Sequence, residues 1–182
     1  MRGVNARSAR LLCVMLLLVG CAGADVPAQW RRFDAHGLRG AHPGGWQVRA
    51  EQQRAWPDAT LEVVGPDAHD PASPVLVVYA EEGAGIDVEG RAAIMIARLE
   101  DELDARVVAR SDPQVPGAVD GLVVEFAFEA LVPGSADPVA SRQFEVILDA
   151  ADGRTFDMML GGPADALDRA TVDGILDALH IT

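Results

Sequence analysis

The side chains best suited to covalent chemistry near the start of the chain are two cysteines, Cys13 and Cys21. Cys13 lies inside an apolar run over residues 11–19 and has no small neighbours. Cys21 lies where that run gives way to small residues, directly after Gly20 and before Ala22. The thiol of Cys21 is therefore the candidate for covalent modification, and its surroundings decide which modification is expected.

The residues before Cys21 have the layout of an export signal. Arg2, Arg7 and Arg10 are the only charges in the first twenty residues, and the apolar run after them is nine residues long. A positively charged start, a short apolar core and small residues around the cleavage site are typical of a secretory signal peptide. A helix needs about 20 residues to cross the bilayer core. The run therefore does not predict a permanent transmembrane anchor.

The segment Leu18-Val19-Gly20-Cys21 resembles the bacterial lipobox. The resemblance implies a thioether between the Cys21 sulfur and diacylglycerol, with cleavage between Gly20 and Cys21. One acyl chain holds a protein weakly, whereas two hold it stably. We therefore predict a signal peptide at 1–20 and a lipidated cysteine with a short tether at 21–29. The expected location is the cell membrane, on its extracytoplasmic face. An ordinary secretory signal with a chance cysteine is the alternative.

The charge of the chain excludes two classes of partner. The net charge is −13, and residues 1–20 carry three of the positive charges, so residues 21–182 carry −16. A body this negative is repelled by nucleic acid and by anionic lipid surfaces. We therefore predict no nucleic acid partner. The 162 residues from 21 to 182 have the size of one domain, which we expect at 30–182.

The residues after the tether alternate between predicted strands and two predicted helices. Apolar and alternating runs predict strands at 30–41, 46–50, 60–64, 75–80, 106–111, 122–130, 141–150 and 155–160. Segment 75–80 is apolar throughout, which predicts a central strand covered on both faces. Asp87 is a suitable N-cap for a helix over 87–104. That helix has an apolar stripe of Val88, Ala92, Met95, Leu99 and Leu103.

The last third of the chain predicts a hairpin and a closing helix. Asp152-Gly153 between two alternating runs is a hairpin signal. Gly161-Gly162-Pro163 is expected to end the second strand, with Pro163 at the start of the helix. One face of this helix is expected to carry Leu167, Ala170, Gly174, Ile175 and Ala178. These elements predict an α+β fold, a mostly antiparallel β-sheet packed by two main α-helices.

The order of these elements, with the turn Pro43-Gly44-Gly45-Trp46, resembles the PsbP-like fold that Mog-type nuclear factors share. Within it, the chain is similar to the actinobacterial LpqN/LpqT lipoproteins, which also carry a lipobox. The resemblance spans roughly residues 32–181 in element order. It implies an antiparallel sheet with helices against its faces, and docking rather than chemistry. A fold does not determine a function.

The search for catalytic residues finds few candidates. The sequence contains no Gly-x-Ser-x-Gly, His-Glu-x-x-His or phosphate-binding motif, and its four histidines stand singly. Glu81 and Glu82 follow the most apolar strand. They are a candidate pair for hydrolysis together with His69-Asp70, or for a calcium ion, although the usual calcium ligand pattern is absent. We predict neither an enzyme nor a bound metal or cofactor.

Trp56 is the third candidate for ligand binding, with Glu81 and Glu82. It precedes Pro57 in a polar stretch where no packing pattern explains it. Such a tryptophan is either a core anchor or a side chain that covers a partner or a sugar. The sequence therefore predicts an exported, membrane-anchored binding or accessory lipoprotein of the bacterial envelope, which docks a protein or another envelope component. The alternative is a carrier of a lipid or glycolipid in the envelope.

Overall fold

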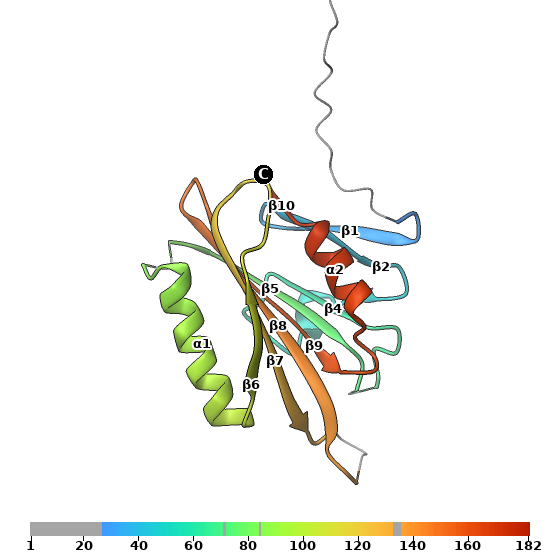
Figure 1. Cartoon of the computed structure of the whole chain (residues 1–182). Coiled ribbons are helices and arrows are strands. Elements are labelled where there is room, and N and C mark those ends of the chain that lie inside the picture. Colours follow the sequence, from blue (N-terminus) through green and yellow to red (C-terminus); the bar gives the residue numbers. More distant parts are fainter. Residues whose placement is uncertain (1–26, 71, 84, 133–135) are drawn as a thin grey trace, which may run out of the picture.

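The computed structural model describes residues 27–182 except 71, 84 and 133–135 (Figure 1). The predicted signal peptide, the cleavage site at Gly20 and Cys21, and most of the tether lie outside the described residues. Two α-helices, α1 (Val88–Leu103) and α2 (Arg169–Asp177), and a short 3₁₀ helix, η1 (Glu51–Gln53), accompany the strands. The strands are β1 (Trp30–Ala35), β2 (Leu38–Pro43), β3 (Gln47–Val48), β4 (Leu61–Val64), β5 (Val75–Glu82), β6 (Arg106–Ser111), β7 (Ala118–Ala130), β8 (Val139–Ala150), β9 (Arg154–Pro163) and β10 (His180–Ile181).

These strands form two sheets in which all the described pairings are antiparallel. The larger sheet has seven strands in the order β3-β4-β5-β9-β8-β7-β6, and the smaller one has the order β1-β2-β10. Figure 1 shows α1 on one side of the larger sheet and α2 with β1 and β2 on the other. The predicted α+β class is therefore confirmed. Strand β5 is an interior strand between β4 and β9, and its Leu76, Val77 and Val78 are buried on both faces, as expected.

The opening strand predicted at 30–41 is a hairpin instead. Its turn is His36-Gly37, where φ is +53° and +100°. Positive φ at both central residues is the requirement of the tight hairpin turn that matches strand twist. The Gly37 amide also donates to Oδ1 of Asp34 at 2.9 Å. The prediction missed this turn because glycine supplies only one of the two positions, and histidine is an uncommon residue at the other.

The end of the chain also differs from the prediction. β9 continues through Gly161-Gly162-Pro163 instead of stopping there, because these residues pair with Gln143, Arg142 and Ser141 of β8. Helix α2 therefore starts at Arg169 and not at Pro163, and Asp168 caps it by accepting from the Thr171 amide at 2.6 Å. Ala170, predicted on its apolar face, is exposed, and Val172 is buried instead.

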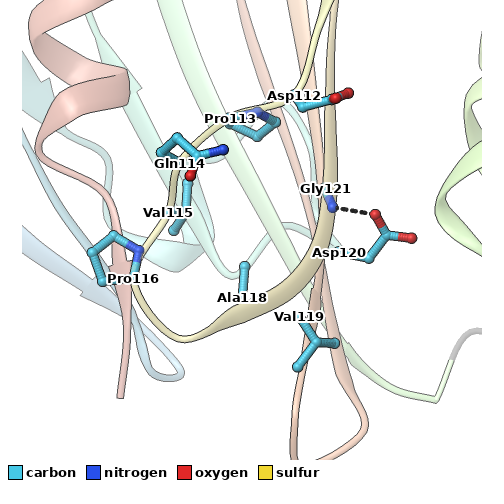
Figure 2. A pocket seen from close by; sticks show the side chains of 9 residues that line it. All are labelled: Asp112, Pro113, Gln114, Val115, Pro116, Ala118, Val119, Asp120 and Gly121. Atoms are coloured by element: carbon cyan, nitrogen blue, oxygen red, sulfur yellow. Dashed lines mark hydrogen bonds between the residues drawn. The ribbon is translucent and has the colours of Figure 1, made fainter.

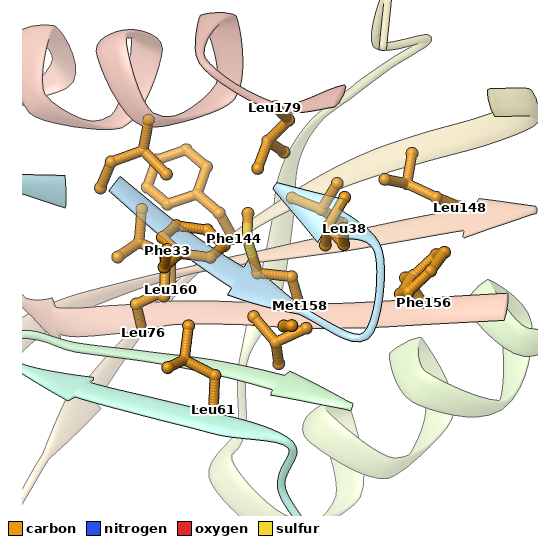
Figure 3. Packing of buried hydrophobic residues seen from close by; sticks show 14 of the residues in the cluster. Phe33, Leu38, Leu61, Leu76, Phe144, Leu148, Phe156, Met158, Leu160 and Leu179 are labelled. Carbon is orange, nitrogen blue, oxygen red and sulfur yellow. The ribbon is translucent and has the colours of Figure 1, made fainter. Parts of the chain in front are cut away.

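One face of the larger sheet carries a continuous apolar area over β4, β5, β8 and β9, which supports the main core. Side chains from β4, β5, β8 and β9 on this face pack against the smaller sheet and α2 (Figure 3). They include the predicted stripe of Phe156, Met158 and Leu160, together with Phe144, Val146, Leu148, Leu61 and Leu76. Phe33, Leu38 and Leu179 cover them from the other layer. This core fixes the positions of the strands whose opposite face forms the site.

The opposite face is covered in two halves. Helix α1 packs on β7 and β8. There Val88, Ala92 and Leu99 of its predicted stripe meet Leu122, Val124, Phe126 and Ile147. Asp87 caps the helix as predicted, by accepting from the Gly90 amide at 2.7 Å. Leu103, at the end of the predicted stripe, is exposed. On the other half, Trp56 of the segment between β3 and β4 lines a cavity together with Tyr79 of β5 and Met159 of β9.

Candidate functional site

A cavity of about 230 Å³ lies on the α1 side of the larger sheet, between the helix and Trp56. We call it the α1 cavity. Its wall on the helix side is Met95, Arg98, Leu99, Glu102 and Leu103. Its floor comes from three adjacent strands, with Tyr79 on β5, Asp157 and Met159 on β9, and Gln143 and Glu145 on β8. The chain thus brings polar groups from distant parts of the sequence under one aromatic side chain.

The antiparallel register explains why these floor residues meet. Tyr79 lies opposite Asp157, and Met159 lies opposite Glu145. Alternate residues of a strand point to the same face, so Asp157 and Met159 share a face, as do Gln143 and Glu145. Asp157 and Glu145 are therefore diagonal neighbours on adjacent strands. Their partners on the other face, such as Met158 and Phe144, belong to the main core.

Glu145 has the most perturbed environment in the cavity. Its residue surface is 4% exposed, and Oε1 accepts a hydrogen bond from the Gln143 side-chain amide. Among the described residues, no arginine or histidine lies within ion-pair distance of it. Burial raises the pKa of Glu145 to about 8, against the smaller opposite effect of the Gln143 bond. Its carboxyl is therefore mainly protonated at neutral pH.

Asp157 lies in a different electrostatic environment from Glu145. Arg91 on α1, whose side chain is 9% exposed, donates from Nη1 to Oδ1 of Asp157 at 3.1 Å and from Nη2 to Asp149. Burial raises the pKa of Asp157, and the Arg91 charge partly offsets this effect. Burial and the nearby Glu145 also raise the pKa of the Tyr79 hydroxyl. Arg91 thus stabilises a carboxylate at Asp157 beside a neutral acid at Glu145.

Trp56 is held at the cavity by a buried carboxylate of β4. Glu62 is 0% exposed, and its Oε2 accepts from the backbone amides of Ala55 at 2.7 Å and Trp56 at 3.4 Å. Its Oε1 accepts from Nη1 of Arg49 at 2.9 Å. Three bonds to one carboxylate fix a segment that is otherwise irregular. Glu62 therefore acts by positioning the wall of the cavity.

The three candidates from the sequence have different outcomes. Trp56 is half-buried and lines the α1 cavity, so it is neither a fully buried core anchor nor a free surface residue. Glu81 and Glu82 are exposed at the end of β5 and do not line this cavity. His69 and Asp70 lie in the loop before β5, at the opposite end of the strand. The four residues suggested for hydrolysis are therefore not brought together.

The prediction missed Tyr79, Glu145 and Asp157 as site residues. Their sequence signal was present but incomplete. Glu145 belongs to the polar alternation of β8, which reads as a solvent-facing edge when each strand is considered alone. Ile147 interrupts that alternation on the same face and is buried under α1. An apolar residue among the polar ones indicates that this face is covered, and it was the signal that could have pointed to a buried carboxyl.

Among the surface hollows larger than the α1 cavity, two lack such a convergent set. One, of about 560 Å³, is formed by nine residues of a single stretch, 112–116 and 118–121 (Figure 2). Its acids are Asp112 and Asp120, and Asp120 already accepts from the Gly121 amide at 2.8 Å. The other, of about 730 Å³, lies beside β7 and β8. Its buried acid, Glu125, is paired with Arg142 and Arg169. The α1 cavity is therefore the better candidate.

Two further searches of the described residues give negative results. No three or more side chains of histidine, cysteine, aspartate or glutamate in this part of the chain are placed to hold a metal ion. None of the helices between residues 27 and 182, masked positions apart, has the length and hydropathy needed to cross a membrane.

No protein-family model matches the sequence, and no curated protein matches it. Solved structures do match. LpqN from Mycobacterium tuberculosis, described as involved in cell envelope biogenesis, superimposes with a TM-score of 0.55 at 17% identity, over 85% of this chain and 91% of LpqN. A crystal structure from Bacteroides thetaiotaomicron gives a TM-score of 0.51 at 13% identity over 85% of this chain. The chain spans about half of that longer protein, 49% of its length. The PsbP-like assignment and the lipobox remain predictions. At these identities the likeness concerns the fold alone, and the chain has an LpqN-like fold.

Proposed function

We propose that the chain is an exported lipoprotein, anchored through Cys21 at the extracytoplasmic face of the cell membrane. There it serves the bacterial envelope by docking a protein partner at the α1 cavity. Three observations support this function: the segment Leu18–Cys21, the LpqN-like fold with the envelope role described for LpqN, and the cavity itself. The cavity carries the docking role, because it joins a half-buried tryptophan to a buried acid that has no cationic partner among the described residues.

The alternative of a lipid or glycolipid carrier fits the cavity less well. Small-molecule sites usually measure about 300–1,000 Å³ and are mostly apolar. The α1 cavity measures about 230 Å³, and its floor carries Tyr79, Glu145 and Asp157. The apolar space on the other face of the sheet is filled by the main core (Figure 3). These dimensions favour the entry of one side chain of a partner over the storage of acyl chains.

Photo-crosslinking in the native host tests the anchoring and the docking together. A photoreactive residue at Leu103, which lines the cavity, is compared with one at Val119, which is exposed and does not line it. We expect the unmodified chain in the membrane fraction, with protein adducts from position 103 and none from position 119. The Cys21→Ser chain is expected in the soluble exported fraction. Membrane retention of Cys21→Ser would refute the anchor, and equal adducts at both positions would refute the docking site.

A further inference from the structure

The α1 cavity combines aromatic side chains, methionine side chains and a buried carboxyl that forms no ion pair within the described part of the chain. We propose that it receives an arginine side chain of the partner protein, whose guanidinium pairs with Glu145 and packs against Trp56. This inference rests on the proposed docking function and adds the chemistry by which the partner is recognised.

The charges that line the cavity favour a cation. Among the described lining residues, Arg98 is the only basic side chain, and its Nε pairs with both carboxylate oxygens of Glu102 at 3.1 Å. Those two rim charges offset each other. Asp157 forms an ion pair with Arg91, which also pairs with Asp149. The remaining acid is Glu145, whose Oε2 accepts no hydrogen bond from the described part of the chain. A positive group that enters the cavity therefore meets one free carboxyl at its floor.

The uncharged lining selects the kind of cation. Trp56 and Tyr79 contribute aromatic side chains to the lining, and Met95 and Met159 contribute polarisable thioethers. A guanidinium is planar, stacks on aromatic faces and pairs with a carboxylate through two parallel N–H donors. A lysine ammonium is more strongly hydrated and does not match either surface as well. The combination therefore fits arginine better than lysine.

Proton release provides a signature of this pairing. Burial raises the pKa of Glu145 to about 8 in the free protein, so an arriving guanidinium meets a protonated carboxyl at neutral pH. A cation within about 4–6 Å favours the ionised form, so binding expels the proton. The affinity should therefore rise as the pH increases from 6 to 8, by up to about tenfold per unit, and level off above 8. The other groups that face Glu145 are Arg98 and Glu102 from α1, Tyr79 from β5 and Asp157 from β9.

The test is a titration of the whole chain in detergent micelles with N-acetyl-arginine amide. N-acetyl-citrulline amide, which has the same shape and no charge, is the control ligand. NMR signals of the Trp56 indole and of the Met95 and Met159 methyls report on the cavity. We expect the arginine compound to shift them with at least tenfold higher affinity than the citrulline compound. Equal affinity of the two compounds would overturn the inference.

Protein variants make the test specific to Glu145. Glu145→Gln keeps the shape of the side chain, and at pH 8 we expect at least tenfold weaker binding of the arginine compound than in the unmodified chain, with no dependence on pH between 6 and 8. The matched control is Glu82→Gln, an exposed acid outside the cavity, which should behave like the unmodified chain. A second variant, Trp56→Leu, should weaken binding at all pH values. Unchanged affinity and pH dependence in Glu145→Gln would overturn the inference.

The crosslinking experiment separates this inference from the docking function. Protein adducts from position 103 that persist at equal yield in Glu145→Gln would leave the docking function standing and overturn arginine recognition. Loss of those adducts in Glu145→Gln, with retention in Glu82→Gln, is the expected result.

Discussion

At the scale of single residues, two neighbouring acids on one sheet face lie in different electrostatic environments. Glu145 has no cationic partner among the described residues, and burial favours its neutral form. Asp157, its diagonal neighbour, is paired with Arg91, which favours the ionised form. Acids with environments this different are typical of binding and catalytic sites. The contrast arises because Arg91 of α1 pairs with Asp157, whereas Arg98, the basic residue of α1 in the described lining, pairs with Glu102 and not with Glu145.

The protonation of Glu145 predicts a pH-dependent effect on stability. Its pKa is raised from 4.5 to about 8 on folding. Between these values the folded state holds a proton that the unfolded state lacks, so this residue's contribution to the free energy of unfolding falls as pH rises. We expect Glu145→Gln to gain stability relative to the unmodified chain between pH 5 and 8. The gain is at most about 1.4 kcal/mol per pH unit. Urea unfolding at several pH values measures it.

The difference in the free energy of unfolding between Glu145→Gln and the unmodified chain reports on Glu145 alone and not on other titrating groups. His42, for example, is buried, and burial lowers its pKa, so it contributes stability that is lost as pH falls below 6.5. That contribution is common to both chains and cancels in the comparison. Glu82→Gln is the control. A stability difference between Glu145→Gln and the unmodified chain that stays constant with pH would contradict the buried neutral acid.

At the scale of elements, local patterns predicted those elements whose partners are close in the sequence. Helix α1 was predicted with its cap because its stripe and Asp87 are local features. The hairpin of β8 and β9 was predicted from Asp152-Gly153. Strand β10 was missed, because two residues at the chain end become a strand only by pairing with β2. The same reason explains the late start of α2, since pairing with β8 keeps 161–163 in β9.

The segment before β4 shows how one residue positions an element of the site. Glu62→Ala would leave the amides of Ala55 and Trp56 without their acceptor. A hydrogen bond to a charged group contributes roughly 1.5–3 kcal/mol. We expect a loss of about 2–4 kcal/mol in the free energy of unfolding, since a partner of a buried ion pair is also removed. Faster hydrogen exchange at the Ala55 amide would show that the segment is released.

An exposed acid of the same segment is the control for this prediction. Glu51→Ala in η1 removes a carboxylate from the surface, and we expect a change within about 0.5 kcal/mol. If Glu62→Ala behaved in the same way, its three hydrogen bonds would not be what holds Trp56 at the cavity.

At the scale of the whole molecule, the two sheets are joined at one end by Arg154. This residue begins β9 of the larger sheet. Its Nη1 donates to the carbonyl of His36 in the turn of the first hairpin, and its Nη2 donates to the carbonyl of Thr182 at 2.8 Å. The Thr182 amide in turn donates to the carbonyl of Gly37 at 3.0 Å. One side chain therefore links the beginning of the described domain, its end and its central strand.

We expect Arg154→Gln to loosen this junction without unfolding the sheet. The amide of Thr182 should exchange with solvent several-fold faster, because its acceptor lies in the turn that Arg154 holds. Amides of β8 should exchange at their original rates. Hydrogen exchange followed by NMR measures both. Arg98→Gln, an exposed arginine on α1, is the control. Equal exchange at Thr182 in both variants would show that the junction does not depend on Arg154.

Alternating patterns predicted which side chains share one face of a strand. That information was sufficient to identify residues of the main core. Phe144, Val146 and Leu148 were predicted on one face of their strand, and they lie there. Predicting the site required the order of the strands as well, because its residues come from strands that are neighbours only in the folded sheet. Tyr79 and Asp157 are 78 residues apart in the chain and become opposite partners only through the order of the larger sheet. No local pattern carries that information.

The two faces of the larger sheet have different roles, since one packs in the main core and the other forms the cavity floor. This difference has a consequence for how the sequence can diverge. The strands under Trp56 are held in place by their apolar side, so the side chains of the cavity floor are not needed to keep those strands in register. Substitutions at Tyr79, Glu145 or Asp157 could accumulate over generations without loss of the architecture. Descendants of one ancestral scaffold could thus acquire new preferences while their backbones stay superimposable.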